Sequence, residues 1–411
     1  MNKKVCIIGL GYIGLPTAAI LANHNYSVLG VDINQSVVDK INQGLIHIVE
    51  PDLDVIVKKS VENNSLKASL VPNFADIFII SVPTPFKEIN GEPVPILDFV
   101  VKATTSIIPF IKDGNIVILE STSPVGTTQL IKKILDENNI NTSNLYIAYC
   151  PERVLPGKIL TELIENDRII GGVNKLSTEV VANFYRTFVT GVVIETDDKT
   201  AEMCKLTENS YRDVCIAFAN ELSIICSLNK IDVWELIRLA NHHPRVNILQ
   251  PGTGVGGHCI AVDPWFIIAQ DPLNSKLIKT ARNVNDYKTE WVIEQINIEA
   301  KKFKINYKKD PVIACLGLSF KPNIDDLRES PAVKVANDLL MLKYKVIVVE
   351  PNITYHNVFI LNSLIEAKKA ADIFVLLVSH NEFLAEIKNG YFNELNLLNF
   401  CTDLNLQNKN E

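Results

Sequence analysis

The sequence of 411 residues contains no CxxC pair, no apolar run of membrane-spanning length and no excess of basic charge. Without cysteines and histidines at metal-ligand spacing, we predict no metal site. Most of the eight cysteines lie in apolar segments such as VCIIG and IACLG, which indicates reduced, buried thiols in a cytoplasmic protein. The net charge of -7 leaves no broad basic surface, so we expect neither nucleic acid nor a membrane as a partner.

Signals for export and for flexible linkers are also missing. Glycines interrupt the apolar run of MNKKVCIIGLG, and no small-residue cleavage site follows it, so we do not interpret it as a signal peptide. A chain of this length with 47% hydrophobic residues exceeds one ordinary core and predicts several globular domains. We expect an N-terminal α/β domain over residues 1–196, a central helical region over 197–300 and a second α/β domain over 301–411.

The N-terminal stretch KVCIIGLGYIGLPTAAILANHNYSVLGVD reads as strand, glycine turn, helix and second strand. In its GxGxxG motif, Gly9 permits the turn, Gly11 lets the backbone approach a pyrophosphate and Gly14 lets helix and strand pack closely. Asp32 ends the second strand, where a carboxylate accepts the ribose 2′-hydroxyl and repels a 2′-phosphate, which favours NAD over NADP. A glycine turn without a nucleotide is the alternative. The predicted cofactor residues of this unit are Gly9, Gly11, Tyr12, Ile13, Gly14 and Asp32.

Further apolar runs predict a doubly wound parallel sheet in the N-terminal domain. These runs cover residues 77–85, 116–127, 145–153, 168–172 and 192–195. Thr84 and Thr122 fall at the carboxyl ends of such strands, where open α/β sheets bind their ligands, so both are predicted to contact the cofactor. Ordinary turn chemistry beside proline explains the two threonines equally well.

From about Lys199 the sequence runs for about thirty residues at helical period without glycine or proline, which predicts a long, mostly buried helix. Lys205, Asn209 and Arg212 share one face of it at i, i+4 and i+7. Polar side chains in such an apolar segment need partners, which points to a binding site. An interhelical polar network or a stripe of snorkelling side chains is the alternative.

Strand, loop, helix and strand recur from residue 311, with apolar runs at 344–351 and 371–380. The fold class we predict is therefore α/β, with two Rossmann-like doubly wound domains joined by a long central helix. The first loop of the second domain carries Lys321 and Arg328, cations that suit a phosphate. Alternatively, both cations pair with Asp325 and Asp326 of the same loop.

Cys259 stands in the glycine-rich stretch GTGVGGHCIAVDP at residues 252–264. A nucleophile, a metal ligand and a packed thiol are all compatible with this setting. Adjacent side chains such as His258 and Cys259 rarely converge on one ion, which disfavours the metal.

Six motifs occur in order: GxGxxG at 9–14, STSPVGT at 121–127, PERVLPG at 151–157, EMCKLTEN in the long helix, GVGGHCIAVDP and FKPNIDDLRES. In these motifs, from about residue 3 to about residue 380, the chain resembles the nucleotide-sugar 6-dehydrogenases of the UDP-glucose/GDP-mannose dehydrogenase superfamily. PERVLPGK and GVGGHC are most similar to the branch that oxidises UDP-N-acetyl-D-mannosamine, whereas the UDP-glucose branch has PEFL and GGSC there.

The resemblance implies two NAD-dependent oxidations at sugar carbon 6, through a thiohemiacetal and a thioester on Cys259. It implies that Lys205 either takes the alcohol proton or stabilises the oxyanions, with Asn209 donating a hydrogen bond. Glu152 and Asp263 are the carboxylates expected to activate and orient water.

The resemblance also implies a UDP-sugar site and a homodimer or larger homo-oligomer, because the counterpart of Arg245 can reach a neighbouring subunit's site. Arg328 matches an arginine at the NAD pyrophosphate. The product would be a uronate for a surface polysaccharide; enzymes for UDP-N-acetylglucosamine or UDP-glucose, and a non-catalytic nucleotide-sugar sensor, are the alternatives. Besides Lys205 and Asn209, the expected substrate-binding residues are Arg153, Val154, Arg212, His243, Arg245, Gly256, Phe320 and Lys321.

Overall fold

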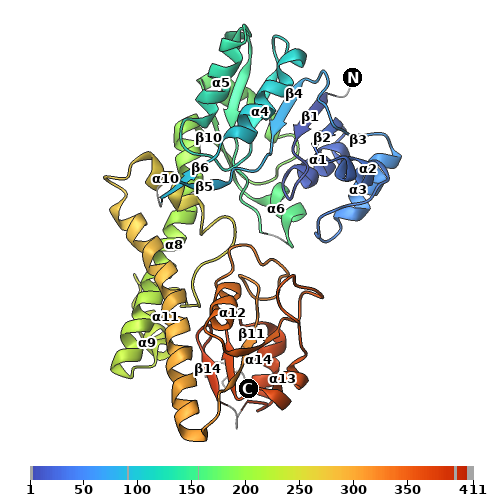
Figure 1. Ribbon diagram of the computed structural model, residues 1–411. Coiled ribbons are helices and arrows are strands. Elements are labelled where there is room, and N and C mark those ends of the chain that lie inside the picture. Colours follow the sequence, from blue (N-terminus) through green and yellow to red (C-terminus); the bar gives the residue numbers. More distant parts are fainter. Residues whose placement is uncertain (1–2, 90–91, 156, 393–395, 405–411) are drawn as a thin grey trace. The chain divides into compact units, whose positions relative to one another are not determined.

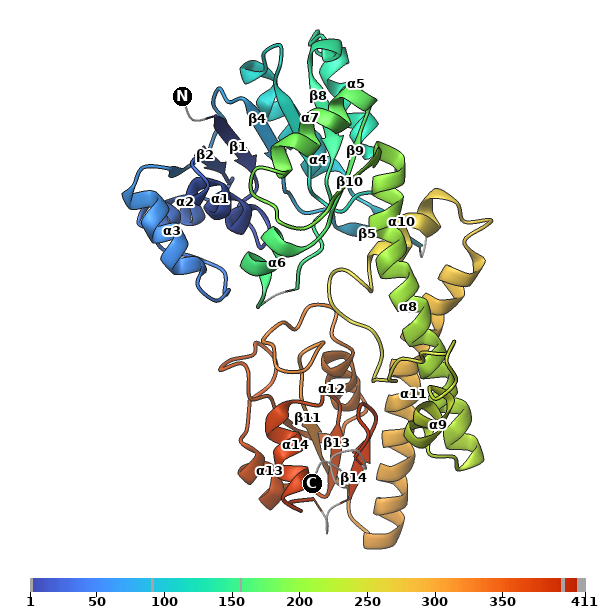
Figure 2. The same cartoon turned by 180° about the vertical axis from the view of Figure 1, so that it is seen from behind.

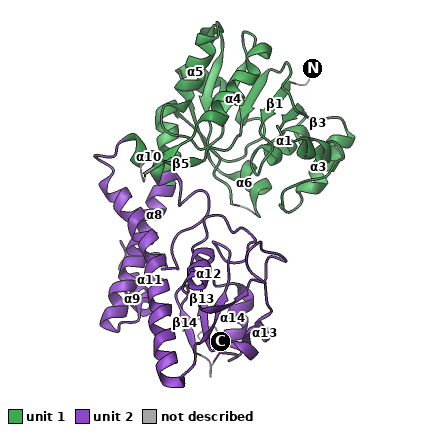
Figure 3. Ribbon diagram, viewed as in Figure 1, with its two compact units in different colours: residues 1–208, 265–270 green, residues 209–264, 271–411 purple. Residues whose placement is uncertain are grey.

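The computed structural model describes residues 3–89, 92–155, 157–392 and 396–404 (Figure 1). The chain forms two compact units (Figure 3). Unit 1 consists of Met1–Glu208 and Trp265–Gln270, and unit 2 of Asn209–Pro264 and Asp271–Glu411. The C-terminal segment 405–411, whose polar composition predicts fraying, lies outside the described residues.

Unit 1 is built on an eight-stranded sheet in the order β10-β9-β8-β7-β4-β1-β2-β3. The strands are β1 (Lys4–Ile8), β2 (Ser27–Val31), β3 (Leu66–Ser69), β4 (Ile77–Ile80), β7 (Ile116–Leu119), β8 (Tyr146–Tyr149), β9 (Arg168–Gly172) and β10 (Val193–Asp197). Neighbours pair in parallel from β3 to β8, as predicted. The prediction of a wholly parallel sheet is wrong for β9 and β10, because β9 pairs antiparallel with β8. An apolar run reveals a strand but not its direction.

Helices cover both faces of this sheet (Figures 1 and 2). Alternate residues of one strand enter different cores: Val5 and Ile7 of β1 pack in one cluster, and Cys6 and Ile8 in another. The helices are α1 (Gly14–Asn23), α2 (Gln35–Asn42), α3 (Leu53–Glu62), α4 (Asp98–Ile107), α5 (Thr127–Glu137), α6 (Ile159–Glu165) and α7 (Lys175–Tyr185), with short 3-10 turns η1 (Ile108–Phe110) and η2 (Thr142–Asn144). A hairpin of β5 (Phe86–Ile89) and β6 (Glu92–Pro95) follows β4.

The long helix is confirmed as α8 (Asp198–Asn229), 32 residues in length. It is not mostly buried, however, because Tyr211, Phe218 and Ile225 expose 69%, 54% and 46% of their surface in the single chain. Helices α9 (Val233–Ala240), α10 (Asp263–Gln270) and α11 (Lys276–Tyr307) follow it. Over the residues that the structure describes, no helix has the length and apolarity needed to cross a membrane.

The second α/β domain is also confirmed, as a four-stranded parallel sheet in the order β12-β11-β13-β14. Its elements are β11 (Val312–Leu316), α12 (Pro331–Met341), β12 (Lys345–Val349), α13 (Leu364–Ala370), β13 (Ile373–Leu376), α14 (Asn381–Lys388) and β14 (Leu397–Asn399). Helix α11 packs Val292 and Ile296 in one cluster with Ile313 of β11 and Val335 of α12. Ser330 caps α12 ahead of Pro331, so the helix starts at a defined point after the loop that follows β11.

Candidate active site

The three glycines of the GxGxxG motif have three different environments. Gly9 has φ +96°, and a Cβ there would lie 2.5 Å from the Ser81 carbonyl oxygen. A Cβ on Gly14 would meet the carbonyl of Gly9. Around a Cβ on Gly11, by contrast, no atom of the described residues lies within 4 Å. The fold itself therefore requires Gly9 and Gly14, whereas Gly11 opens onto space at the start of α1.

Asp32 lies beside this turn. Its Oδ2 accepts a hydrogen bond from the Leu10 amide at 3.1 Å, and its Oδ1 accepts one from the Asn34 amide at 2.9 Å. Asp32 remains half-buried, so part of the carboxylate faces outward. Tyr12 is exposed, and Ile13 is half-buried ahead of α1. An open cradle above Gly11, with a carboxylate at the end of β2, fits a dinucleotide with an unphosphorylated ribose.

Thr84 and Thr122 are brought together from the loops after β4 and β7. The Thr84 hydroxyl donates to the Thr122 carbonyl oxygen at 2.6 Å. This bond joins the two loops, as the alternative of ordinary turn chemistry allows, and does not exclude a contact of Thr84 with the cofactor. The half-buried Thr122 side chain remains on the same edge of the sheet.

Glu152 is held by a buried ion pair that the sequence reasoning missed. Nη1 of Arg168 lies 2.6 Å from Glu152 Oε2, and both side chains are almost fully buried. The other carboxylate oxygen accepts the Arg153 amide at 2.6 Å, while Nη2 of Arg168 donates to the Leu163 carbonyl. The arginine that opens the apolar strand RIIGG was the available signal, since a buried arginine needs a partner. The carboxylate of Glu152 is thus fixed in one orientation.

A second buried acid, Glu120, lies behind this pair. Ser81 and Tyr185 donate hydrogen bonds to its two oxygens at 2.8 and 2.9 Å. Burial, followed by the neighbouring Glu152 carboxylate, raises the pKa of Glu120 to about 7. Glu120 therefore takes up its proton at a higher pH than an exposed glutamate does, while Arg168 stays paired with Glu152.

Two predicted substrate residues follow Glu152 directly. The guanidinium of Arg153 forms an ion pair with Glu208 of α8 at 2.7 Å and donates to the Asp167 carbonyl at 3.3 Å. Val154 packs against the apolar cluster beneath α1. Arg153 therefore stays at the surface in a defined position, and Val154 has a packing role.

The polar face of α8 divides into different environments. Asn209 is 8% exposed, and its Nδ2 donates to Asp263 Oδ2 at 2.5 Å. Lys205, one turn earlier on the helix, is half-buried, whereas Arg212 is exposed. Asn209 is thus part of a buried polar network, and Arg212 lies at the surface; both observations are compatible with the predicted binding roles.

Cys259 is coupled to Asp263 through the backbone. The carbonyl oxygen of Cys259 accepts the amides of Val262 and Asp263 at 3.0 and 2.8 Å, in the turn that starts α10. The structure thereby brings together Cys259, Asp263 and Asn209, three of the predicted catalytic residues. Cys259 is half-buried, and all eight cysteines are thiols. Among the described residues, no group of three or more His, Cys, Asp or Glu side chains could hold a metal ion.

The glycines before Cys259 are packed against another loop of unit 2. A Cβ on Gly256 would lie 2.5 Å from the Glu329 carbonyl oxygen and 2.8 Å from Phe320 Cβ. Gly257, with φ +83°, faces the Phe320 ring and donates its amide to the Arg328 carbonyl at 3.0 Å. The family resemblance implies that such glycines let the backbone approach the sugar, and Gly256 is among the predicted substrate-binding residues. The structure shows that they also leave room for Phe320 and the adjoining backbone.

Two buried side chains that the sequence reasoning missed hold the start of the same stretch. Asn220 of α8 accepts the Gly252 amide at 2.9 Å, and Thr289 of α11 donates to the Thr253 carbonyl at 3.0 Å. Their periodic spacing within long helices resembles that of packing residues, so the sequence carries no clear signal for them.

Of the two cations in the loop after β11, one is paired. Arg328 forms a 2.6 Å ion pair with Asp326, as the pairing alternative predicts. Lys321 is exposed and forms no ion pair with any part of the chain that is described. His243 and Arg245 lie in the exposed loop after α9, where His243 Nδ1 accepts the Arg245 amide at 3.3 Å.

Comparison with known proteins gives consistent results along the chain. Residues 3–189 match the NAD binding domain of the UDP-glucose/GDP-mannose dehydrogenase family, residues 199–287 its central domain and residues 314–397 its UDP binding domain. A UDP-N-acetyl-D-mannosamine dehydrogenase of Campylobacter jejuni is 54% identical over 93% of this chain and 97% of its own.

Two other proteins are similar over nearly as much of the chain. An NDP-N-acetyl-D-galactosaminuronic acid dehydrogenase of Ralstonia nicotianae is 51% identical over 93% of this chain and 92% of its own. The solved structure of a UDP-N-acetyl-mannosamine dehydrogenase from S. aureus superimposes with a TM-score of 0.84 at 44% identity, covering 92% of this chain and 90% of that one. The chain therefore belongs to the UDP-glucose/GDP-mannose dehydrogenase family and is an NAD-dependent dehydrogenase with that family's NAD binding, central and UDP binding domains.

Proposed function

We propose that this enzyme oxidises UDP-N-acetyl-D-mannosamine at carbon 6 to the uronate, using two NAD and one water, for surface polysaccharide synthesis. The observation that carries the proposal is the cluster of Cys259, Asp263 and Asn209 within a chain 54% identical to an enzyme named for that substrate. A non-catalytic nucleotide-sugar sensor would need neither Cys259 nor Lys205, and the chain has both.

NAD fits the residues of unit 1, since Gly11 leaves open space and Asp32 presents a half-buried carboxylate beside it. When bound, NAD supplies the acceptor for one hydride in each oxidation. Arg328 is assigned to the NAD pyrophosphate, for which its guanidinium must be shared with Asp326 or leave it.

Cys259 is the residue that changes covalently. Its thiolate adds to carbon 6 of the aldehyde formed in the first oxidation, giving a thiohemiacetal, and loss of hydride from that carbon gives a thioester. Lys205 takes the proton of the alcohol or stabilises the oxyanions of both adducts. Asn209 orients Asp263 through their hydrogen bond.

Hydrolysis of the thioester requires a positioned water. Asp263 and Glu152 are assigned to its activation and orientation, and Arg168 keeps Glu152 in one geometry. Water adds to the thioester carbon, the C–S bond breaks and the thiol is regenerated with release of the carboxylate. Two NADH per sugar and one oxygen atom from water complete the balance.

The UDP-sugar is assigned to the exposed cation of Lys321 and to Phe320 in unit 2, and to Arg153, Arg212, His243 and Arg245. A second candidate substrate is a nucleotide-linked N-acetyl-D-galactosamine compound, because the Ralstonia nicotianae relative is 51% identical. The deciding test is NADH formation from UDP-N-acetylmannosamine, UDP-N-acetylglucosamine, UDP-N-acetylgalactosamine and UDP-glucose. Polar contacts to the acetamido group should favour the first over UDP-glucose by about a hundredfold or more in kcat/KM. Equal efficiency with UDP-glucose would contradict the substrate assignment and leave the family assignment intact.

The active form is proposed to be a homodimer or a larger homo-oligomer that pairs through α8. Tyr211, Phe218 and Ile225 recur every seven residues and expose about half or more of each side chain, a stripe suited to a second copy. Phe218→Asp should lower the mass measured by light scattering, whereas Glu221→Asp on the same helix should not. An unchanged mass in Phe218→Asp would contradict pairing through this stripe.

A cytoplasmic location is proposed from the eight thiols. The functional division is proposed to be NAD binding in residues 1–196, catalysis and pairing in 197–300 and UDP-sugar binding in 301–411.

A further inference from the structure

The turn that follows β1 in unit 1 has a counterpart in the turn that follows β11 in unit 2. The Gly9 amide donates to the Val31 carbonyl at 2.8 Å, and the Gly317 amide donates to the Val349 carbonyl at 2.8 Å. Both glycines have positive φ, +96° and +92°. One residue later, Leu10 donates to Asp32 and Leu318 donates to Glu350. Glu350 therefore occupies in unit 2 the structural position that Asp32 occupies in unit 1.

The two acids differ in what remains available to a ligand. Asp32 is half-buried, but Glu350 is 5% exposed and its oxygens are used internally. Oε2 accepts the amides of Leu318 at 2.6 Å and Ser319 at 3.1 Å, while Oε1 accepts the amide of Asn352 at 2.9 Å. Such a carboxylate has no oxygen available to accept a hydrogen bond from a ribose hydroxyl, so Glu350 instead stabilises the loop after β11.

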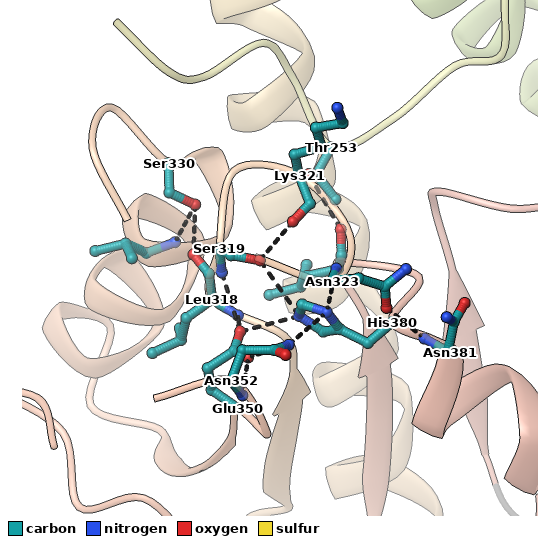
Figure 4. A network of polar contacts seen from close by, with 12 residues as sticks. Thr253, Leu318, Ser319, Lys321, Asn323, Ser330, Glu350, Asn352, His380 and Asn381 are labelled. Carbon is teal, nitrogen blue, oxygen red and sulfur yellow. Dashed lines mark hydrogen bonds and ion pairs between the residues drawn. The ribbon is translucent and has the colours of Figure 1, made fainter. Parts of the chain in front are cut away.

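Two side chains also contact Glu350: the Asn352 amide donates to Oε1 at 3.2 Å, and His380, which is fully buried after β13, faces Oε2 (Figure 4). Nδ1 of His380 accepts the backbone amide of Asn323 at 2.9 Å and faces the Asn352 side-chain amide at the same distance. An acceptor at Nδ1 places the ring proton on Nε2, which donates to Glu350 Oε2 at 3.0 Å. His380 thus links the acid at the end of β12 to the loop after β11.

That loop packs against the glycines that precede Cys259. Its residue Phe320 lies against Gly256 and Gly257, three and two residues before Cys259, and its neighbour Lys321 is the exposed cation assigned to the UDP-sugar. Ser319 closes the turn by donating to the Lys321 carbonyl at 2.7 Å.

We infer that His380, together with Glu350, is a positioning residue that sets the 319–323 loop so that Lys321 meets the UDP-sugar and Phe320 supports the Cys259 stretch. This inference rests on the proposed function for the substrate role of Lys321. Burial alone would raise the pKa of Glu350, but hydrogen bonds from His380 and from the Leu318 and Asn352 amides outweigh it and hold the pKa at about 2. The anchor is therefore ionised over the whole physiological range.

Two substitutions of His380 separate the contacts of its two ring nitrogens. Nδ1 faces the Asn323 and Asn352 amides, whereas Nε2 faces Glu350 Oε2 and, at 3.3 Å, the Ser319 hydroxyl. His380→Asn keeps an acceptor near the Nδ1 position, facing the Asn323 amide, and loses the donor to Glu350. His380→Gln keeps a donor near the Nε2 position and loses the acceptor. Of the two direct contacts with the loop, the Nδ1 bond to the Asn323 amide is the shorter, 2.9 Å against 3.3 Å between Nε2 and the Ser319 hydroxyl. His380→Gln should therefore raise KM for the UDP-sugar by about tenfold or more, and His380→Asn by about threefold or less. KM for NAD should stay unchanged in both.

A matched control exists in the same domain. His356 is half-buried and also accepts backbone amides at Nδ1, from Val358 at 3.1 Å and Phe359 at 3.2 Å, in a loop without assigned site residues. His356→Gln makes the same chemical change and should leave KM for the UDP-sugar unaltered. An equal rise in KM in His356→Gln, or none in His380→Gln, would overturn the inference.

Thiol alkylation tests the loop without turnover. In His380→Gln, iodoacetamide should modify Cys259 about threefold faster or more, as measured by peptide mass spectrometry, because Phe320 no longer packs firmly on the glycines. Cys315 in β11 is fully buried, so its modification reports opening of the sheet and should not change. Equal acceleration of both thiols would show a purely structural role and overturn the inference.

UDP alone provides the remaining measurement. Calorimetry should show UDP binding weakened about tenfold in His380→Gln and retained in His356→Gln. If the wild-type enzyme oxidised none of the UDP-sugars, the proposed function would fail, while the UDP and alkylation results would still decide the role of His380.

Discussion

Replacing Gly11 by alanine should abolish tight NAD binding and leave the fold of unit 1 intact. A Cβ at Gly11 meets no atom of the described residues within 4 Å, and Gly11 is not among the positive-φ residues. The change in unfolding free energy should therefore stay within about 0.5 kcal/mol, or reach about 1 kcal/mol of stabilisation through the stiffer unfolded chain. The new methyl group instead occupies the space assigned to the pyrophosphate. Overpacking of about 1.5–3 kcal/mol corresponds to a Kd for NAD that is about 10- to 150-fold higher.

Gly14→Ala provides the matched contrast in the same motif. Its Cβ would meet the Gly9 carbonyl, which is backbone and cannot move without opening the turn. We expect a loss of about 3 kcal/mol or more in the stability of unit 1, with NAD binding reduced as a consequence.

Both variants can be measured by urea unfolding, followed by far-UV circular dichroism, and by titration of NADH fluorescence. The expected pattern is an unchanged unfolding midpoint with weakened binding for Gly11→Ala, and a lowered midpoint for Gly14→Ala. A Gly11→Ala enzyme that binds NADH within twofold of the wild-type Kd would refute the assignment of this space to the pyrophosphate.

Four further substitutions test other parts of the account. Cys259→Ser should lower the rate of two-NADH turnover by about a hundredfold or more; a wild-type rate would exclude a cysteine nucleophile. Asp32→Ala should shrink the kcat/KM preference for NAD over NADP about tenfold, and equal use of both by the wild type would contradict the charge argument. Hydrogen bonds hold the pKa of Glu350 at about 2, so its contribution to the free energy of unfolding is complete above about pH 4.5 and is lost as pH falls through about 2, by up to about 1.4 kcal/mol per pH unit. Glu350→Gln should reduce this loss of stability in acid, as measured by urea unfolding at several pH values. Burial lowers the pKa of Lys288 to about 7, so between about pH 7 and 10.5 the unfolded chain binds more protons than the folded one, and the free energy of unfolding should rise with pH. Lys288→Met should lack this rise, which a comparison of urea unfolding midpoints at pH 7 and 9 can check.

The sequence pattern over a few neighbouring residues was enough to predict most helices, strands and turns. The glycine turn at Gly9, the apolar strands of both sheets and the helix without glycine or proline are each determined by residues a few positions apart. Asn209 and Asp263 form a hydrogen bond although 54 residues separate them. Both were predicted as site residues because each lies in a motif of the family that the sequence resembles.

Contacts between distant segments could not be read from spacing. Arg168 lies 16 residues from Glu152, and the Thr253 hydroxyl bonds to the Leu377 carbonyl 124 residues away. The buried His380 follows an apolar strand, where any residue that fills the space would give the same pattern. The reversed direction of β9 rests on pairing at Ala148 and Tyr149 alone, which no periodicity encodes.

The glycine-rich stretch before Cys259 is ordered because hydrogen bonds and packing hold it to its neighbours. Fixing each residue costs about 1–2 kcal/mol of backbone entropy, and glycine costs most, so residues 252–257 would be mobile if left to themselves. Four bonds oppose this mobility: Gly252 to Asn220, Thr253 to Thr289 and to Leu377, and Gly257 to Arg328. At about 1 kcal/mol each, such bonds offset roughly half of the entropy, and burial of Phe320 against the glycines supplies a further part. A stretch balanced in this way is ordered only while its neighbours are in place, which is the physical basis on which we infer that the loop after β11 influences Cys259.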